Sequence, residues 1–378
     1  MAENYRIATL AIHADDHHAH TSDIASPIHL SSTYAYNSDP AQLKTLKELK
    51  DAGGFHEDII YSRYNQPVVV RIEEVLSKLL DGYAVAYSSG LSAFHAAMIY
   101  FNPKNVFIGQ AYQGCKQILN ILERNYGVKS HPLESASELI QPGDVIHLES
   151  PINPYGTAID IEHYVKIAHS RGAFVLLDST FAPPPLQFPF EFGVDMIMHS
   201  ATKYFGGHSD LLAGVLVSKD PKVAEALHAD RNYIGTITAS LESWLMLRSL
   251  RTYDLRVRKQ VANAVKIVKY LDEHRAEFPA LKSLTHASLQ KEEFVKRQLP
   301  LNGGPVFSIE VASPEIARIL PSKTKLFHHA TSLGGVESLI EWRAMSDSVI
   351  SNTLLRISVG VEDADDLIED LCNALKQL

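Results

Sequence analysis

Two side chains suited to covalent carbonyl chemistry follow consecutive apolar stretches of the chain. Asp178 ends a stretch that begins at Ala173, and Lys203 comes shortly after the stretch 196–198. Parallel strands end at one edge of a sheet, where open α/β folds bind ligands, so both groups are expected there. A partly desolvated lysine can be a neutral nucleophile at pH 7, and a carboxylate can pair with a cationic ring nitrogen. The pair could therefore hold a cofactor that has an aldehyde and a protonated ring.

Pyridoxal phosphate (PLP) is a cofactor of this kind, since it needs a Schiff-base lysine and an acidic partner for its pyridine nitrogen. Ser200 and Thr202 precede Lys203 in the run Ser-Ala-Thr-Lys and offer hydroxyl donors for phosphate oxygens. Taken alone, this short run also suits an ordinary surface lysine. Asp178 favours the cofactor interpretation without deciding it.

Two further motifs have the form of cofactor contacts. Ser89, Gly90 and Leu91 stand between an apolar run, 83–87, and a helical pattern, so a close backbone approach and free N–H groups at a helix start could bind a phosphate. The same spacing also occurs in ordinary strand–helix turns. Tyr112 follows another apolar stretch and could stack on an aromatic ring, although a loop tyrosine fits equally.

The elements that would position these residues alternate between apolar runs and helical spacing. We expect helices at 68–80, 91–100 and 161–170, and strands at 106–108, 145–148, 173–177, 196–198 and 215–217. This alternation predicts an α/β domain, with a mostly parallel sheet covered by helices on both faces.

The pattern changes beyond about residue 230. We expect a long helix at 243–268, strands at 306–311 and 354–359, and a closing helix at 363–378. The predicted organisation is an N-terminal arm (1–55), a large cofactor-binding domain (56–235) and a smaller C-terminal α+β domain (236–378).

The first fifty residues are irregular and end in a polar, helix-like stretch at 42–51. Five histidines fall between His13 and His29, but their spacing matches no compact ligand set. We therefore predict no metal site, and interpret this region as an arm that packs on another subunit.

Composition limits the possible partners. The 378 residues are 46% hydrophobic and have a net charge of −9, which argues against nucleic-acid binding and against a basic membrane contact. No apolar run approaches the roughly 20 residues that span a bilayer. Cys115 and Cys372 make no disulfide framework, and no secretory signal is visible at the start. These features lead us to expect a soluble, cytoplasmic protein.

Several motifs together resemble the PLP signature of the Cys/Met-metabolism trans-sulfuration family. That family includes cystathionine γ-synthase, cystathionine γ-lyase, cystathionine β-lyase and methionine γ-lyase. The resemblance runs in order along nearly the whole chain, through residues 11–13, 61–63, 89–91, 149–154, 178–183, 193–195, 200–204, 207–210, 332–339 and 355–360. It implies the fold type I of PLP aminotransferases, and a homotetramer built from tight dimers.

The resemblance also implies a role for each matching residue. Lys203 would bind the cofactor and move protons, and Tyr112 would stack on the ring and act as a base. The other cofactor contacts would come from Asp178, Thr180, Asn153, Ser89, Gly90, Leu91, Ser200 and Thr202, with Tyr61 and Arg63 reaching the phosphate in a neighbouring subunit. Arg356, helped by Ser338, would bind the carboxylate of a sulfur amino acid, and Glu337 would favour chemistry at the γ-carbon.

The substrate side departs from the family pattern. Gln117 stands where many members have an arginine for the distal carboxylate, and Trp342 and Arg343 lie where they have a histidine and a Met-Thr-His-Ala stretch. Arg343 is a candidate replacement for the lost cation. Methionine γ-lyase would show a cysteine near the substrate, which Cys115 does not match in position.

The preferred function is therefore that of a cystathionine γ-lyase or γ-synthase. A cystathionine β-lyase is the alternative among enzymes. A PLP-binding pseudoenzyme with a regulatory role is the alternative of another class, because the substrate-side residues are altered.

Overall fold

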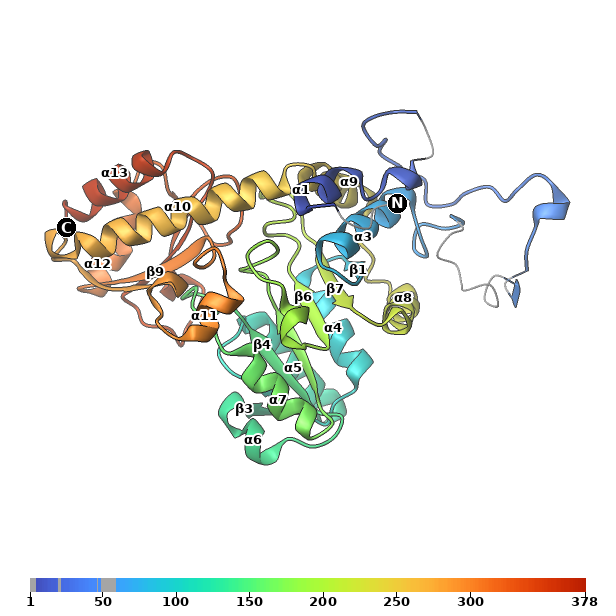
Figure 1. Cartoon of the computed structure of the whole chain (residues 1–378), viewed down its shortest axis with the longest axis horizontal. Coiled ribbons are helices and arrows are strands. Elements are labelled where there is room, and N and C mark those ends of the chain that lie inside the picture. The colour runs from blue at the N-terminus through green and yellow to red at the C-terminus, as the bar shows by residue number, and fades with distance from the viewer. Residues whose placement is uncertain (1–4, 20–21, 46, 49–58) are drawn as a thin grey trace.

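The computed structural model describes residues 5–19, 22–45, 47–48 and 59–378. It shows two α/β parts, each built around its own sheet (Figure 1). The larger sheet has the order β1-β7-β6-β5-β4-β2-β3, in which β7 is antiparallel to both neighbours and the remaining pairs are parallel. Its strands are β1 Tyr83–Tyr87, β2 Asn105–Ile108, β3 Lys129–Pro132, β4 Val145–Glu149, β5 Phe174–Asp178, β6 Met196–His199 and β7 Gly214–Ser218.

Helices pack on both faces of this sheet, as the alternating pattern predicted. Because successive strand residues face opposite sides, Ala84 and Ala86 of β1 join one apolar core, while Val85 and Tyr87 join another. The first core includes residues of α3 Pro67–Leu79 and α7 Ile161–Ser170, and the second those of α4 Gly90–Phe101, α5 Gln113–Tyr126 and α8 Pro221–Ile234. The short helix α6 Ala136–Leu139 packs against α7.

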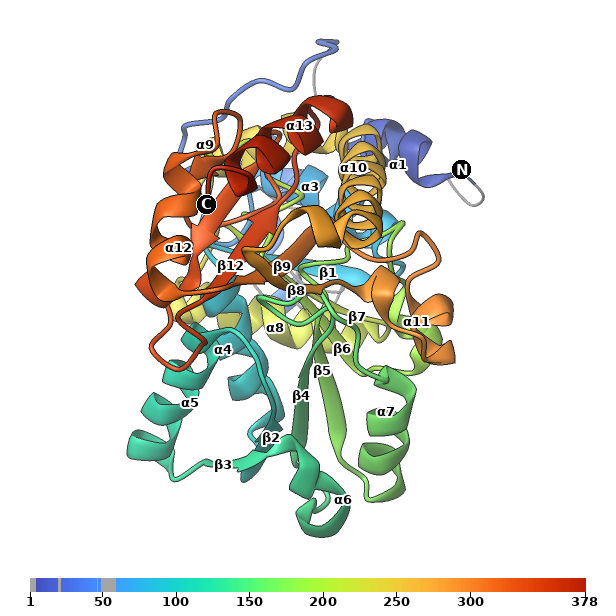
Figure 2. The same cartoon turned by 90° about the vertical axis from the view of Figure 1, so that its left-hand side faces the viewer.

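The smaller part has a five-stranded sheet in the order β10-β11-β12-β9-β8, covered by two long helices (Figure 2). Its strands are β8 Leu281–Thr285, β9 Val306–Val311, β10 His328–His329, β11 Leu339–Trp342 and β12 Leu354–Ser358, and its helices are α10 Tyr253–Glu273, α11 Glu293–Gln298, α12 Pro314–Ile319 and α13 Ala364–Leu375. The fold is type I, the α/β fold of PLP-dependent aminotransferases expected from the resemblance.

The single helix expected at 243–268 is wrong, because two helices occupy this range. α9 Ser240–Leu250 ends before α10 begins, and Thr252 between them leaves the helical region at φ −112° and ψ 11°. Arg251 at the junction donates to the carbonyl groups of Ala11 and Ile12. Apolar residues continue on both sides of the break, which is why periodicity alone did not reveal it.

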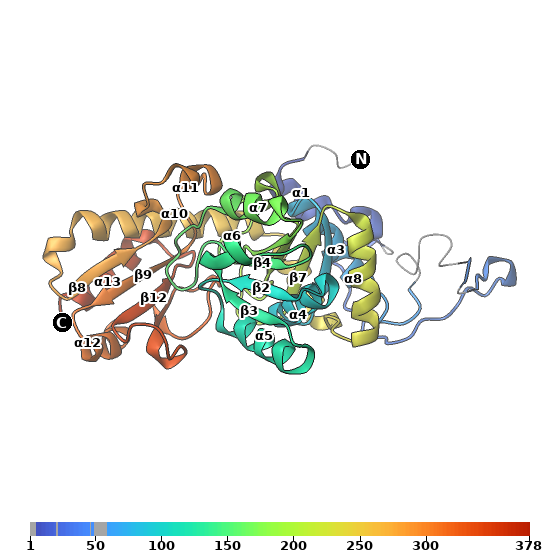
Figure 3. The same ribbon diagram turned by 90° about the horizontal axis from the view of Figure 1, so that it is seen from below.

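Helix α10 passes from one core to the other. Val257 and Val261 in its first half belong to the core of the large sheet, whereas Ile267 and Leu271 belong to that of the small sheet. Figure 3, the view from below, shows the helix lengthwise, extending beside both parts. The domain boundary placed at 235 stays a prediction.

The N-terminal residues are fixed to the large part at one buried carboxylate. Asp15 follows α1 Ile7–His13 and lies between Arg71 of α3 and Arg251, with N–O distances of 2.5 Å and 2.7 Å. The side-chain hydrogen bonds and the charges of the two arginines hold the Asp15 pKa below its usual value, against the opposing effect of burial. This three-residue contact, the Asp15 clamp, joins segments far apart in sequence.

In the segment beyond the clamp, residues 22–45, the Ser26 carbonyl still accepts a hydrogen bond from Trp244 of α9, and the chain then runs away from the body of the molecule (Figure 1). Ile24 and Leu30 in this segment are fully or largely exposed, which supports the expectation that it packs on another subunit. Of the helix-like stretch expected at 42–51, residues 46 and 49–51 lie outside the described residues, and residues 43–45 are not helical. His17 and His18 place ligand atoms within 4.8 Å of each other and of Glu74. The prediction that no metal is bound there stays untested. No helix in the described part of the chain has both the length and the apolar character needed to cross a membrane.

Candidate active site

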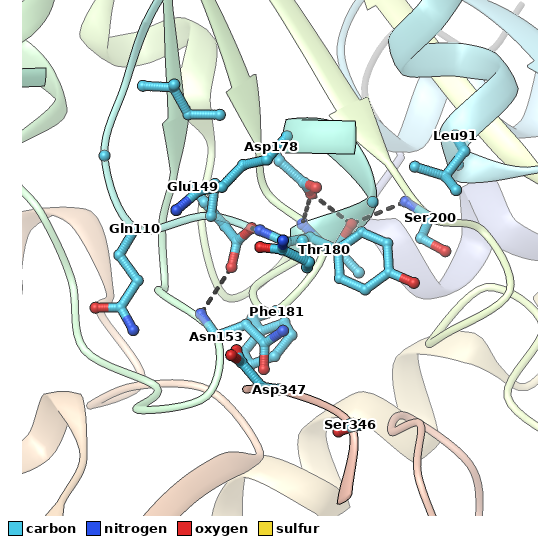
Figure 4. Close-up of a pocket in the computed structure, with 18 of the residues that line it drawn as sticks. Leu91, Gln110, Glu149, Asn153, Asp178, Thr180, Phe181, Ser200, Ser346 and Asp347 are labelled. Carbon is cyan, nitrogen blue, oxygen red and sulfur yellow. Dashed lines mark hydrogen bonds between the residues drawn. The ribbon is translucent and has the colours of Figure 1, made fainter. Parts of the chain in front are cut away.

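A cavity of about 1280 Å³ opens where β4, β5 and β6 end, and residues of both parts line it (Figure 4). The sequence-predicted residues that line this cavity are Ser89, Gly90, Leu91, Tyr112, Asn153, Asp178, Thr180, Ser200, Thr202, Lys203 and Arg356. The parallel strands therefore deliver most of the predicted side chains to one place.

Asp178 is the buried end residue of β5, and Thr180 holds its carboxylate. The Thr180 hydroxyl donates to Oδ1 at 2.5 Å and the Thr180 N–H donates to the same atom at 2.9 Å (Figure 4). The Ser200 N–H in turn donates to the Thr180 hydroxyl oxygen at 2.8 Å. Burial raises the Asp178 pKa to about 6, although the hydrogen bonds from Thr180 and the charge of Lys203 oppose this rise. These bonds connect the acid to the turn that carries the lysine.

Lys203 lies in that turn, just after β6. Its Nζ donates to the Ser332 hydroxyl at 2.8 Å, across the boundary between the two parts. Burial, and next the positive charge of Arg356, lower the Lys203 pKa from 10.5 to about 8. An amine with this pKa is partly neutral near pH 7, which a nucleophile requires. The structure thus brings the predicted lysine and Asp178 to one cavity, where their charges interact.

The loop around Ser332 is shaped by backbone conformations that side chains rarely adopt. Ser332 itself has φ +85°, and Gly334 has φ +83°. A Cβ atom at Gly334 would lie 2.9 Å from the carbonyl carbon of Lys203, so only glycine fits this contact. The small part is therefore packed directly on the lysine turn.

The start of α4 forms a concave surface beside Lys203. The Ser89 hydroxyl caps the helix by accepting from the Ser92 N–H at 3.0 Å. At Gly90, an added Cβ would come within 3.0 Å of the Ser200 side chain, so the two backbones approach closely. Free N–H groups at the start of a 12-residue helix favour an anion. The phosphate contacts predicted within one chain are together here, and Thr202 fixes the surface through its hydroxyl, which accepts from the Ala213 N–H.

Glu149 joins two predicted residues by their backbones. Its carboxylate accepts from the N–H groups of Tyr112 and Asn153, both at 2.7 Å. Burial, and next the negative charge of Asp178, raise the Glu149 pKa to about 8. Sequence reasoning did not assign Glu149 a role, although a carboxylate at the end of a predicted strand was the same signal that singled out Asp178.

Arg356 is buried on β12 and points to the cavity from the small part. Its Nη1 donates to the Asn153 amide oxygen at 2.9 Å, and its Nη2 donates to the Ser332 carbonyl at 2.9 Å. Nη2 also pairs at 2.5 Å with Glu341, the residue directly opposite on β11. A planar guanidinium held in this way suits a carboxylate ligand.

Two predicted substrate residues lie away from the cavity lining. Ser338 is fully buried, and its hydroxyl donates to Glu362 at 2.9 Å and accepts from the Gly360 N–H at 2.9 Å. Glu337 accepts a hydrogen bond from the hydroxyl of Ser209. The Ser338 hydroxyl is therefore used within the small part and does not line the cavity.

Tyr61 and Arg63 also lie outside this cavity as the described residues define it. Arg63 stacks over the rings of Tyr61 and Tyr64, with its guanidinium carbon 5.6 Å and 4.7 Å from the ring centres. Its Nη1 donates to the Asn232 carbonyl at 2.6 Å. Their predicted contact with the phosphate of a neighbouring subunit stays a prediction.

The residues that depart from the family pattern fall into two groups. Gln117 is exposed and accepts from Asn120, while Cys115 is buried, which raises its thiol pKa. Arg343, by contrast, is buried and lines the cavity, together with Lys116. The substrate side therefore retains cationic groups at positions other than 117.

Residues 8–376 match the model of a family described as Cys/Met metabolism PLP-dependent enzyme. The chain belongs to this family of PLP-dependent trans-sulfuration enzymes. It is 33% identical over 360 residues to a cystathionine γ-lyase of Bacillus subtilis, covering 89% of this chain and 93% of the relative. It is 34% identical over 381 residues to a cystathionine γ-synthase of Escherichia coli, covering 93% of each.

Solved structures agree with this membership. The crystal structure of cystathionine γ-lyase from yeast superposes with a TM-score of 0.87 at 31% identity, covering 100% of this chain and 99% of that one. The residues here fit the family's cofactor. The close approach of Gly90 to Ser200 leaves an N–H surface suited to a phosphate, and Asp178 offers a buried carboxyl group, the kind of partner that a cationic ring nitrogen needs.

Proposed function

We propose that this enzyme binds PLP at Lys203 and acts on a carbon–sulfur bond at the γ-carbon, as a cystathionine γ-lyase or γ-synthase. The observation that carries the proposal is the meeting of Lys203 and Asp178 in one cavity, which Arg356 of the small part also lines. The relatives' names support the γ-carbon and the thioether substrate class.

The chain's own residues have distinct tasks in this proposal. PLP, when bound, withdraws electrons from the amino-acid substrate and makes its α-proton acidic. Arg356 binds the substrate carboxylate and fixes the α-carbon above the lysine. Lys203, with a pKa of about 8, takes and returns protons at Nζ. Asp178 keeps the pyridine nitrogen protonated, and Tyr112 covers the ring.

A product screen tests the proposal. Purified holoenzyme is incubated with cystathionine, with O-acylhomoserines plus cysteine, and with methionine, and the products are identified by mass spectrometry. Cysteine, 2-oxobutyrate and ammonia from cystathionine identify the γ-lyase, and cystathionine from an O-acylhomoserine identifies the γ-synthase. Homocysteine, pyruvate and ammonia would replace the proposal with a β-lyase, and bound PLP without turnover would indicate a pseudoenzyme.

The cofactor assignment has a spectroscopic test of its own. The lysine-linked cofactor should give an absorption band near the boundary of the visible and ultraviolet, and Lys203→Ala should lose both this band and turnover. A mutant that keeps either one contradicts the role of Lys203. The homo-oligomeric state and the cytoplasmic location are also proposals, supported by the exposed apolar arm and the two free cysteines.

A further inference from the structure

The cavity wall in the small part contains an arginine and an aspartate whose side chains are near each other without a hydrogen bond between them. Arg343 and Asp347 both line the cavity, and their Nη2 and Oδ2 atoms are 3.8 Å apart, beyond hydrogen-bond distance. Figure 4 shows Asp347 and Ser346 on a small-part loop, across the pocket from the strand ends that bear Glu149 and Asp178.

The guanidinium of Arg343 has donors that its neighbours do not satisfy. The residue is 7% exposed, and its buried Nε has no hydrogen-bond partner within the described part of the chain. Buried donors are normally paired, because leaving one unsatisfied costs about 1–3 kcal/mol. Arg343 lines the cavity, and the nearest acceptor of its Nη2 among the described residues is 3.8 Å away, so this end of the guanidinium remains available to a ligand in the cavity.

The carboxylate of Glu341 does not satisfy the remaining hydrogen-bond donors of Arg343. Its Oε2 atom accepts from both Arg343, at 2.9 Å, and Arg356, while its Oε1 accepts from the Ser346 hydroxyl at 2.6 Å. One carboxylate is thus shared by two guanidinium groups. Arg356 has two further acceptors, whereas the only further acceptor near Arg343 among the described residues is the carboxylate of Asp347, at 3.8 Å.

We propose that Arg343 and Asp347 form a subsite for the second amino-acid head of a thioether substrate, with the carboxylate on Arg343 and the ammonium on Asp347. The inference rests on the proposed function, in which Arg356 binds the first head. In the lyase direction the subsite holds the leaving cysteine, and in the synthase direction it holds the incoming one. A cavity of about 1280 Å³ exceeds the roughly 300–1,000 Å³ of most ligand pockets, so cofactor and a two-headed substrate both fit.

Lys116 is the competing cation. It lines the cavity from α5 on another side, and its charge opposes the rise of the Glu149 pKa. A carboxylate bound by Lys116 would make Arg343 only a support for Glu341. The two possibilities predict different variants to lose recognition, so they can be separated.

The experiment compares four substrates that share one head and differ in the other. Cystathionine has both distal groups, S-(2-carboxyethyl)homocysteine only the carboxylate, S-(2-aminoethyl)homocysteine only the ammonium, and S-ethylhomocysteine neither. For Arg343→Met, kcat/KM should fall about 10- to 100-fold on the two substrates with a distal carboxylate, as expected for a lost charge-assisted hydrogen bond. It should stay within about twofold of the wild-type value on the two substrates without one. For Asp347→Asn, kcat/KM should instead fall on cystathionine and S-(2-aminoethyl)homocysteine, the two substrates that have a distal ammonium.

Three control variants test whether Arg343 contacts the distal carboxylate directly. Arg318→Met, at an exposed position of α12, should leave all four values unchanged. Arg343→Lys should regain part of the lost discrimination. An equal loss on all four substrates by Arg343→Met would mean that the residue acts through Glu341 on Arg356, and would overturn the subsite. The same conclusion follows if Lys116→Met, and not Arg343→Met, removes the preference for the carboxylate.

Failure of the proposed function would look different. In that case the wild-type holoenzyme turns over none of the four compounds. Calorimetric titration of the holoenzyme with the same compounds then measures the subsite directly, since Arg343→Met should weaken only the binding of those that have a distal carboxylate. Equal affinity of the wild-type protein for cystathionine and S-ethylhomocysteine would overturn the inference.

Discussion

At the scale of single residues, the lowered pKa of Lys203 has a direct kinetic consequence. With a pKa of about 8 instead of 10.5, the amine is roughly one-tenth neutral at pH 7. PLP uptake by the apoprotein should therefore accelerate about tenfold per pH unit up to pH 8 and then level off, as followed by the absorption band. A rate that keeps rising towards pH 10 would contradict the shift.

The same shift affects stability in a defined window. The folded protein binds the Lys203 proton more weakly than the unfolded chain does, so between pH 8 and 10.5 the unfolded chain holds more of it. The contribution of this group to the unfolding free energy of the apoprotein should accordingly increase with pH across that window. Lys203→Met should remove this increase, which urea titrations at pH 8 and 10 would measure.

Glu149 gives a second residue-scale prediction. Glu149→Gln replaces one carboxylate oxygen by an amide NH₂, which must face the N–H of Tyr112 or of Asn153. The start of α5 should be held less firmly, and the dissociation constant of PLP should rise about tenfold, as expected when one buried N–H group loses its acceptor. Glu134→Gln, on the exposed rim of the same cavity, is the matched control for equilibrium titration with PLP. Equal effects of the two variants would exclude a specific role for Glu149.

At the scale of elements, the contact between Gly334 and the lysine turn can be tested against a second left-handed glycine. Gly127 has φ +76° with nothing within 4 Å of an added Cβ, so Gly127→Ala should lower the unfolding free energy by only about 1 kcal/mol. Gly334→Ala adds a clash with the Lys203 backbone, for which about 1–3 kcal/mol more is expected. Chemical denaturation compares the two, and only Gly334→Ala should also weaken PLP binding. If both variants lost a similar unfolding free energy, the loop around Gly334 would be able to shift and remove the clash.

Sequence patterns predicted the elements that deliver the cofactor groups, and missed those whose roles depend on distant neighbours. The apolar runs of β5 and β6 placed Asp178 and Lys203 at one edge. The edge strand β3, with the sequence Lys-Ser-His-Pro, has no apolar alternation and was not predicted. No sequence pattern assigned a role to Glu341, because its importance comes from facing Arg356 across the β11–β12 pair.

At the scale of the whole molecule, the placement of Tyr61 and Arg63 outside their own cavity makes a mixing experiment informative. If Arg63 serves the site of another subunit, Arg63→Met and Lys203→Ala should each be nearly inactive alone. Hybrids formed by mixing the two should regain activity, because one site then receives wild-type residues from both chains. Size-exclusion chromatography with light scattering would confirm that hybrids form. Assembled hybrids without regained activity would show that Arg63 does not act between subunits.

The Asp15 clamp has a consequence for anyone who shortens this protein. Arg71 is buried, and Arg251 is partly so, and both depend on a single carboxylate near the start of the chain. Deleting the first 15 residues would leave two positive groups facing each other without a counter-charge, a loss of about 3–5 kcal/mol for a buried pair. Trimming this extension, a routine step towards better crystals, should instead yield a protein that aggregates on expression.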